Sequence, residues 1–176
     1  MTTLLLARHG ETDWNRELRI QGSSDIALNE RGREQARVLA QELADVPLDA
    51  IYSSDLSRAR ETAEAVAKTH ALEVRLDSRL RERAFGSWEG LTREDVAALP
   101  NGSRHDGESD DEVRERVLAA VQAIADVHPG EQVLVVGHGG SLNALWHHAV
   151  GERVERWANC AVYRLAVREG EFRPVD

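Results

Sequence analysis

Leu4-Leu5-Leu6-Ala7-Arg8-His9-Gly10-Glu11-Thr12 places an arginine and a histidine directly after a short apolar run. Such a run predicts a buried strand, and ligands bind beyond the carboxyl ends of the strands in open α/β sheets. Val133-Leu134-Val135-Val136-Gly137-His138-Gly139-Gly140 has the same form, with a histidine and two glycines after the apolar run. Two strand-end histidines so far apart along the chain predict one pocket that is assembled from both halves of the fold.

From this first strand the chain alternates between strand and helix. Apolar periodicity, with capping signals at Asn29, Thr92 and Ser109, predicts helices at about 30–44, 56–68, 92–99, 109–129 and 141–150. Further strands are expected at 49–53 and 73–76, with a C-terminal hairpin of 160–167 and 171–175. We expect 12–28 to be irregular and 80–90 to form a loop at the pocket rim. The alternation favours one domain over residues 1–176, a three-layer α/β/α sandwich with a mostly parallel central sheet.

Composition narrows the class of protein. A chain of 176 residues is large enough to bury its own core, and 41% apolar with 30% charged residues is typical of a soluble protein. A net charge of −9 argues against nucleic acid or an anionic membrane as a partner. One cysteine, Cys160, excludes an internal disulfide and suits a reducing compartment. With no apolar stretch near the ~20 residues of a membrane span, we expect a cytoplasmic protein.

The residues at the strand ends suggest phosphate chemistry. Arg8 and His9 follow the first strand, Arg58 follows the second, Glu82 lies in the rim loop and His138 follows the fourth strand. Arginine holds phosphate oxygens bidentately and stays charged at any working pH. A neutral imidazole is a competent nucleophile, and a carboxylic acid can protonate a departing oxygen. Together these groups would suit a phosphate monoester.

Several ordered motifs carry a family resemblance. Arg8-His9-Gly10-Glu11-Thr12 followed by Trp14-Asn15 resembles the signature of the histidine phosphatase superfamily, which has the phosphoglycerate mutase-like fold. Further segments resemble that family in the same order along nearly the whole chain. They are 25–28 with Gly32, 52–59 with Thr62-Ala63, 80–90, 107–109 and 136–140.

The resemblance implies a role for each matching residue. His9 resembles the nucleophile that becomes a phosphohistidine, and Glu82 resembles the proton donor that later acts as the base on water. Arg8, Arg58 and His138 resemble the groups that hold the phosphoryl oxygens, and a charged His138 would add to the positive charge of the two arginines. Asn15, Gln21, Gly22 and Gly139 resemble further substrate contacts, although plain turn roles stay open for Asn15, Gln21 and Gly22.

The resemblance implies no metal and no cofactor, because the arginines already supply positive charge. His147-His148 and His105 suggest a metal site as an alternative. Adjacent helical histidines point about 100° apart, so they form a poor chelate. Arg81 and Arg83 are expected to be surface charges or to form ion pairs rather than to bind the ligand. Trp14 and Trp88 either line the pocket mouth or pack in the core.

The expected function is that of a metal-independent phosphomonoesterase acting on small phosphorylated metabolites. A mutase that depends on 2,3-bisphosphoglycerate is the first alternative, and a phospho-ligand binding module with little turnover is the second. Mutases resemble this chain but carry inserted segments with extra cations, whereas residues 90–107 offer Arg93 and Arg104 alone. Ser23 stands where mutases typically carry tryptophan. Both differences favour the phosphatase. The substrate stays undefined, and the C-terminal hairpin offers an edge through which a homodimer could form.

Overall fold

A six-stranded sheet forms the centre of the protein in the computed structural model, which describes residues 1–175. The strand order is β3-β2-β4-β1-β5-β6, and β5 alone runs against the other strands. The strands are β1 Thr2–Arg8, β2 Ala50–Ser53, β3 Val74–Leu76, β4 Gln132–Gly137, β5 Val162–Arg168 and β6 Glu171–Val175. The predicted mostly parallel sheet is confirmed.

Strand β1 is central because both of its faces are apolar. Leu4 and Leu6 pack into the core on one face of the sheet, and Leu5 and Ala7 pack into the core on the other. All four side chains are fully buried. A strand buried on both faces carries a continuous apolar run rather than an alternating one, and the two cores make the predicted three-layer sandwich.

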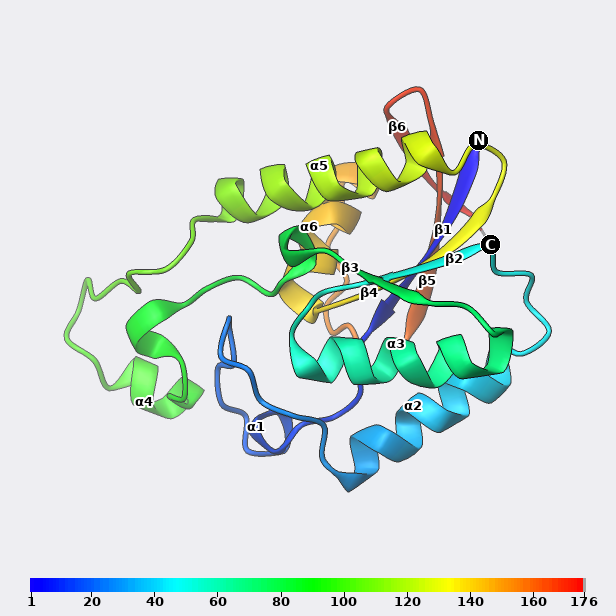
Figure 1. The fold of residues 1–176 in the computed structure, drawn as a ribbon. Helices are drawn as coiled ribbons and strands as arrows, with labels where there is room; N and C mark the ends of the chain where they lie inside the picture. Colours follow the sequence, from blue (N-terminus) through cyan, green and yellow to red (C-terminus); the bar gives the residue numbers. More distant parts are fainter. Residues whose placement is uncertain (176) are drawn as a thin grey trace.

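Four long helices cover the two faces (Figure 1). Helices α2 (Glu30–Glu42) and α3 (Ser57–His70) pack against each other on one face, and α5 (Asp110–Val127) and α6 (Gly139–Val150) do so on the other. The predicted N-cap residues are confirmed: Asn29 accepts from the backbone of Gly32, and Ser109 forms a capping box with Glu112.

Shorter elements gather beyond the carboxyl ends of the parallel strands. Helices α1 (Asp13–Arg16) and α4 (Arg93–Ala97) project there, in the segments between β1 and α2 and between β3 and α5 (Figure 1). Two 3₁₀ turns, η1 (Ser78–Leu80) and η2 (Gly86–Trp88), belong to the second segment. The expectation that 12–28 is irregular is wrong for α1. A Thr12–Asn15 capping box nucleates that single turn without any apolar periodicity.

The C-terminal hairpin has the expected form, and β6 lies at the edge of the sheet. A homodimer through this edge stays a prediction. Within residues 1–175 every helix is too short or too polar to cross a bilayer.

Candidate active site

The pairing of β1 with β4 brings the two strand-end histidines together. Arg8 lies opposite Gly137 in this parallel pair. The residues that follow them, His9 and His138, therefore lie opposite each other. The backbone N–H of His9 donates to the carbonyl of Gly137 at 3.0 Å. The imidazole centroids of His9 and His138 are 5.1 Å apart, and both side chains are buried.

The hydrogen bond of His9 determines which of its nitrogens is free. Its Nδ1 lies 2.6 Å from the carbonyl oxygen of Gly10. A carbonyl only accepts, so Nδ1 carries the proton and Nε2 of the neutral ring keeps its lone pair. Thr62 fixes the same backbone, because its hydroxyl accepts from Gly10 N at 3.1 Å and donates to the carbonyl of Arg58 at 2.7 Å. The local backbone therefore presents Nε2 as the nucleophilic atom.

His138 has the opposite tautomer. The Nε of Arg58 lies 3.2 Å from His138 Nδ1, and a guanidinium only donates. Nδ1 is therefore the acceptor and Nε2 of the neutral ring carries the proton. This Nε2 and the Nε of Arg8 are buried and make no hydrogen bond within residues 1–175. Buried donors without a partner are costly, so the pair indicates a site for an anion.

Burial and neighbouring charge keep both imidazoles neutral. The pKa of His9 is held well below its usual value, chiefly by burial and in addition by the guanidiniums of Arg8 and Arg58. Burial, then Arg58, does the same to the pKa of His138. Burial and the neighbouring guanidiniums thus favour a neutral His138 over the charged form suggested by the sequence. Positive charge comes from the two arginines, which stay protonated at neutral pH.

Arg58 is fully buried and organises the site as well as charging it. Its Nη1 donates to the carbonyl of Ser24 at 2.7 Å and its Nη2 donates to that of Gly22 at 2.8 Å. Gly22 has φ +55, a backbone conformation that favours glycine. Arg58 therefore fixes the turn at residues 22–24 and the tautomer of His138 at the same time.

Glu82 lies over the N-terminus of α6. Its carboxylate accepts from the backbone N–H groups of Arg83, Gly140 and Ser141, each at 2.9 Å. A Cβ on Gly140 would lie 2.5 Å from Oε1 of Glu82, so a larger residue there would displace the carboxylate. Burial lowers the pKa of both Arg8 and Arg58, and the Glu82 carboxylate opposes that effect in each case, as expected if it faces them across the cavity.

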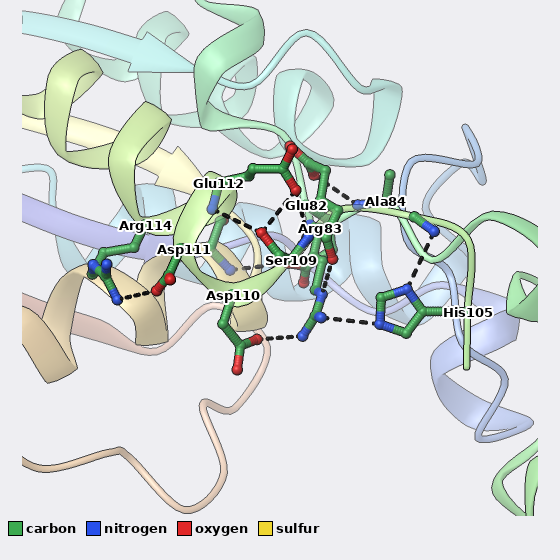
Figure 2. Close-up of polar contacts among 12 residues, drawn as sticks. Glu82, Arg83, Ala84, His105, Ser109, Asp110, Asp111, Glu112 and Arg114 are labelled. Carbon is green, nitrogen blue, oxygen red and sulfur yellow. Dashed lines mark hydrogen bonds and ion pairs between the residues drawn. The ribbon is translucent and has the colours of Figure 1, made fainter. Parts of the chain in front are cut away.

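The rim loop that carries Glu82 is tied to α5. Figure 2 shows the guanidinium of Arg83 between Asp110 and His105. Arg116 of α5 donates to the carbonyl of Glu82 at 3.0 Å and pairs with Glu108. The neighbouring Arg81 pairs with Asp55. The predicted ion-pair roles of Arg81 and Arg83 are confirmed, and these bonds set the position of the Glu82 backbone.

A cavity of about 420 Å³ contains most of the predicted site residues. Those that line it are Arg8, His9, Asn15, Gln21, Gly22, Arg58 and Glu82. His138 and Gly139 lie behind this lining: the ring of His138 packs on His9, and Gly139 lies beside Arg8. The Oδ1 of Asn15 accepts from Thr12 N, so this residue caps α1 as well as lining the cavity.

Asn159 lines the cavity but was not predicted as a site residue. Asn159 donates from Nδ2 to the carbonyl of His9 at 2.9 Å and fixes the nucleophile's backbone from the C-terminal segment. The aromatic side chains of Trp14, Phe85 and Trp88 form an apolar part of the wall, which places the two tryptophans at the pocket. Asn159 stands in a segment without periodicity or capping signals, so the sequence alone offered no reason to single it out.

Residues 1–175 hold no group of three or more histidine, cysteine or acidic side chains arranged to bind a metal ion. His105 instead contacts Arg83, and the exposed His148 packs on Phe172.

The fold and the site together define an α/β protein with an arginine-lined pocket at the carboxyl edge of its sheet. The family described as "Histidine phosphatase superfamily (branch 1)" matches residues 4–176. The chain belongs to this superfamily and has its phosphoglycerate mutase-like fold.

Similar proteins carry both phosphatase and mutase names. The probable phosphoglycerate mutase GpmB of Cronobacter sakazakii is 39% identical over 98% of this chain and 88% of its own length. The mycobacterial glucosyl-3-phosphoglycerate phosphatase Rv2419c, solved with VO3, superposes with a TM-score of 0.86 at 32% identity, covering 97% of this chain and 95% of its own. The phosphoserine phosphatase of Entamoeba histolytica, solved with phosphoserine, superposes with a TM-score of 0.87 at 26% identity, covering 100% of this chain and 96% of its own. The chain is thus an enzyme of the histidine phosphatase class.

Proposed function

We propose that the protein is a metal-independent phosphomonoesterase that acts on small phosphorylated metabolites through a phosphohistidine at His9. The observation that carries this proposal is the pairing of tautomers. His9 offers a lone pair at Nε2, while the unpartnered Nε2–H of His138 and Nε–H of Arg8 offer donors nearby. Phosphoryl transfer depends on such positioning and on fixed positive charge.

The reaction would proceed in two transfers. His9 Nε2 forms a bond to phosphorus while the P–O bond to the alcohol breaks, and protonated Glu82 gives its proton to the departing oxygen. Glu82 then takes a proton from water, whose oxygen attacks phosphorus and breaks the N–P bond. Inorganic phosphate leaves and the neutral imidazole is restored. Arg8, Arg58 and His138 stabilise the charge on the phosphoryl oxygens in both transfers.

A phosphoglycerate mutase is the second candidate, favoured by the name of the GpmB relative. A mutase must shield its phosphohistidine from water, whereas the segment between Gly90 and Gly107 supplies only the five-residue α4 and a turn. Hydrolysis of p-nitrophenyl phosphate, compared with isomerisation of 3-phosphoglycerate with and without 2,3-bisphosphoglycerate, separates the two. A binding module would show neither activity.

His9→Ala tests the proposal directly. We expect a loss of at least about 10³-fold in kcat, because the nucleophile and its intermediate disappear together. The exposed His147, which does not line the cavity, provides the control variant His147→Ala with unchanged kcat. Mass spectrometry at neutral or alkaline pH, where phosphohistidine survives, should find the phosphoryl group on the peptide that contains His9. Full activity in His9→Ala would overturn the assignment.

A further inference from the structure

We propose that Arg93 and Arg156 bind a second anionic group of the substrate, so that the enzyme favours phosphomonoesters whose alcohol carries a carboxylate or another phosphate. The inference rests on the proposed function, because it concerns the same cavity. It assigns a specificity role to two residues outside the phosphoryl pocket.

Among the residues that the structure describes, Arg93 and Arg156 stand out because their side chains lack the partners that most arginines of this protein have. The chain has 31 acidic against 22 basic residues, so carboxylate partners are plentiful. Nevertheless the side chains of Arg93, Arg104 and Arg156 make no hydrogen bond or ion pair within residues 1–175. Two of these three line the cavity that contains His9. Unpaired cations at a pocket, in an acidic protein, indicate that the missing anion belongs to a ligand.

The charge of the cavity lining supports a second anion. Five arginines and two glutamates line it. Arg19 is neutralised by Glu17 at 2.7 Å, and Glu11 pairs with Arg31 at 3.7 Å. The Glu82 carboxylate and a phosphomonoester dianion then oppose four arginines, which leaves one positive charge in excess, or two when Glu82 is protonated as in the proposed reaction. Arg58 is fixed by backbone carbonyls, so we place the excess on Arg93 and Arg156.

The two outer arginines approach the cavity from different elements. Arg93 begins α4, and Arg156 lies in the segment before β5. Both are exposed, whereas Arg58 is fully buried. Burial lowers the pKa of Arg8, and the charge of Arg156 adds to that effect, so Arg156 lies within electrostatic range of the phosphoryl site. An anion a few bonds from the phosphate could therefore reach the outer pair.

An apolar wall lies along the same cavity. Trp14, Trp88 and Leu18 line it, and Leu18 is 65% exposed with φ +57. This conformation ends α1, because the backbone N–H of Arg19 donates to the carbonyl of Trp14 at 2.8 Å, and the Leu18 side chain stays exposed at the cavity. These side chains offer a surface for the carbon skeleton between the two anions of the substrate.

Matched substrate pairs test the inference. Glycerol 3-phosphate and 3-phosphoglycerate differ in their far end, a neutral alcohol or a carboxylate. Fructose 6-phosphate and fructose 1,6-bisphosphate differ in a second phosphate. For each pair, the preference is kcat/KM for the substrate with the second anion divided by kcat/KM for the other substrate. We expect Arg93→Gln and Arg156→Gln each to lower this preference about fivefold in at least one pair, and the double variant to lower it about 20-fold. The pair that responds identifies the anion.

Arg104→Gln is the control, because it removes the same charge from an unpaired arginine that does not line the cavity. A wild-type ratio near one in both pairs, or equal ratios in all variants, would overturn the second-anion site and leave the phosphatase assignment standing. Binding of 3-phosphoglycerate and glycerol 3-phosphate to His9→Ala, with and without Arg156→Gln, reads the same preference without turnover. Catalytic failure of the wild type would thus contradict only the proposed function.

Discussion

In the proposed mechanism His138 is a neutral donor at Nε2, because Arg58 occupies its Nδ1. Two substitutions separate the donor at Nε2 from the acceptor at Nδ1. The amide of a glutamine would reach the position of Nε2, whereas the amide of an asparagine would reach only the position of Nδ1. We expect His138→Gln to keep a donor for the phosphoryl group and lose about 10-fold in kcat. His138→Asn should keep a partner for Arg58 and lose about 10³-fold, as for removal of one oxyanion donor.

The measurement is kcat with p-nitrophenyl phosphate, accompanied by thermal unfolding because His138 is fully buried. Equal losses of kcat in the two variants, at equal stability, would contradict a donor role at Nε2.

Single residues differ in how far the sequence could predict them. Arg8, His9 and His138 follow strong apolar runs, so their place at the strand ends could be read from the pattern. Arg156 and Asn159 stand in the irregular segment between α6 and β5. Their side chains reach the cavity only through the tertiary path of that segment, which no periodicity records.

At the scale of elements, Glu89 joins the rim loop to the turn at residues 22–24. Its carboxylate accepts from the backbone N–H groups of Ser23, Ser24 and Phe85, each at 2.9 Å. Burial alone would raise the pKa of Glu89, but hydrogen bonds from Ser24, Phe85 and Ser23 outweigh it and lower that pKa. The same turn carries the carbonyls that hold Arg58, so Glu89 positions Arg58 indirectly.

Glu89→Gln should therefore loosen the turn and weaken substrate binding. We expect KM for p-nitrophenyl phosphate to rise about tenfold, since hydrogen bonds to a charged group contribute about 1.5–3 kcal/mol, with a smaller change in kcat. Glu94→Gln, an exposed change in the first turn of α4, is the matched control. A KM unchanged from that control would show that the turn keeps its shape without Glu89.

The elements themselves were predictable where a cap or an apolar face marked them. Asn29, Thr92 and Ser109 fixed the starts of α2, α4 and α5. Glycine has a low helix propensity, yet a Cβ at Gly32, early in α2, would lie 2.0 Å from the carbonyl oxygen of Glu11. The need for this close approach between two backbones depends on tertiary packing, which propensity does not describe.

At the scale of the molecule, the strand order decides which residues meet. Alternation of strand and helix predicts a mostly parallel sheet, but it does not say that β4 lies between β2 and β1. That order places the ends of β1, β2 and β4 side by side and brings His9, Arg58 and His138 together. The residue pattern predicted that the two strand-end histidines share a pocket, and the family resemblance implied a joint role for His9, Arg58 and His138, but neither gave the strand order.

Folding therefore buries two imidazoles in a site that already contains two guanidiniums, and stability should depend on pH. In the unfolded chain a histidine titrates near pH 6.5. In the folded protein the pKa of His9 and of His138 lies well below that value. Below about pH 6.5 the unfolded state then binds more protons than the folded state, so the free energy of unfolding falls as the pH falls. Each histidine contributes up to about 1.4 kcal/mol per pH unit.

Urea unfolding between pH 7.5 and 5.5 measures this slope in a window above the range in which carboxylates titrate. His9→Gln removes one of the two buried imidazoles of the site and should reduce the slope by about half, whereas the exposed His147→Gln should leave it unchanged. A wild-type slope retained in His9→Gln would mean that this imidazole is not held neutral by the fold. The same cause should keep Nε2 of His9 unprotonated in mildly acidic solution. The acid limb of kcat/KM that arises from the nucleophile should then fall well below pH 6.5.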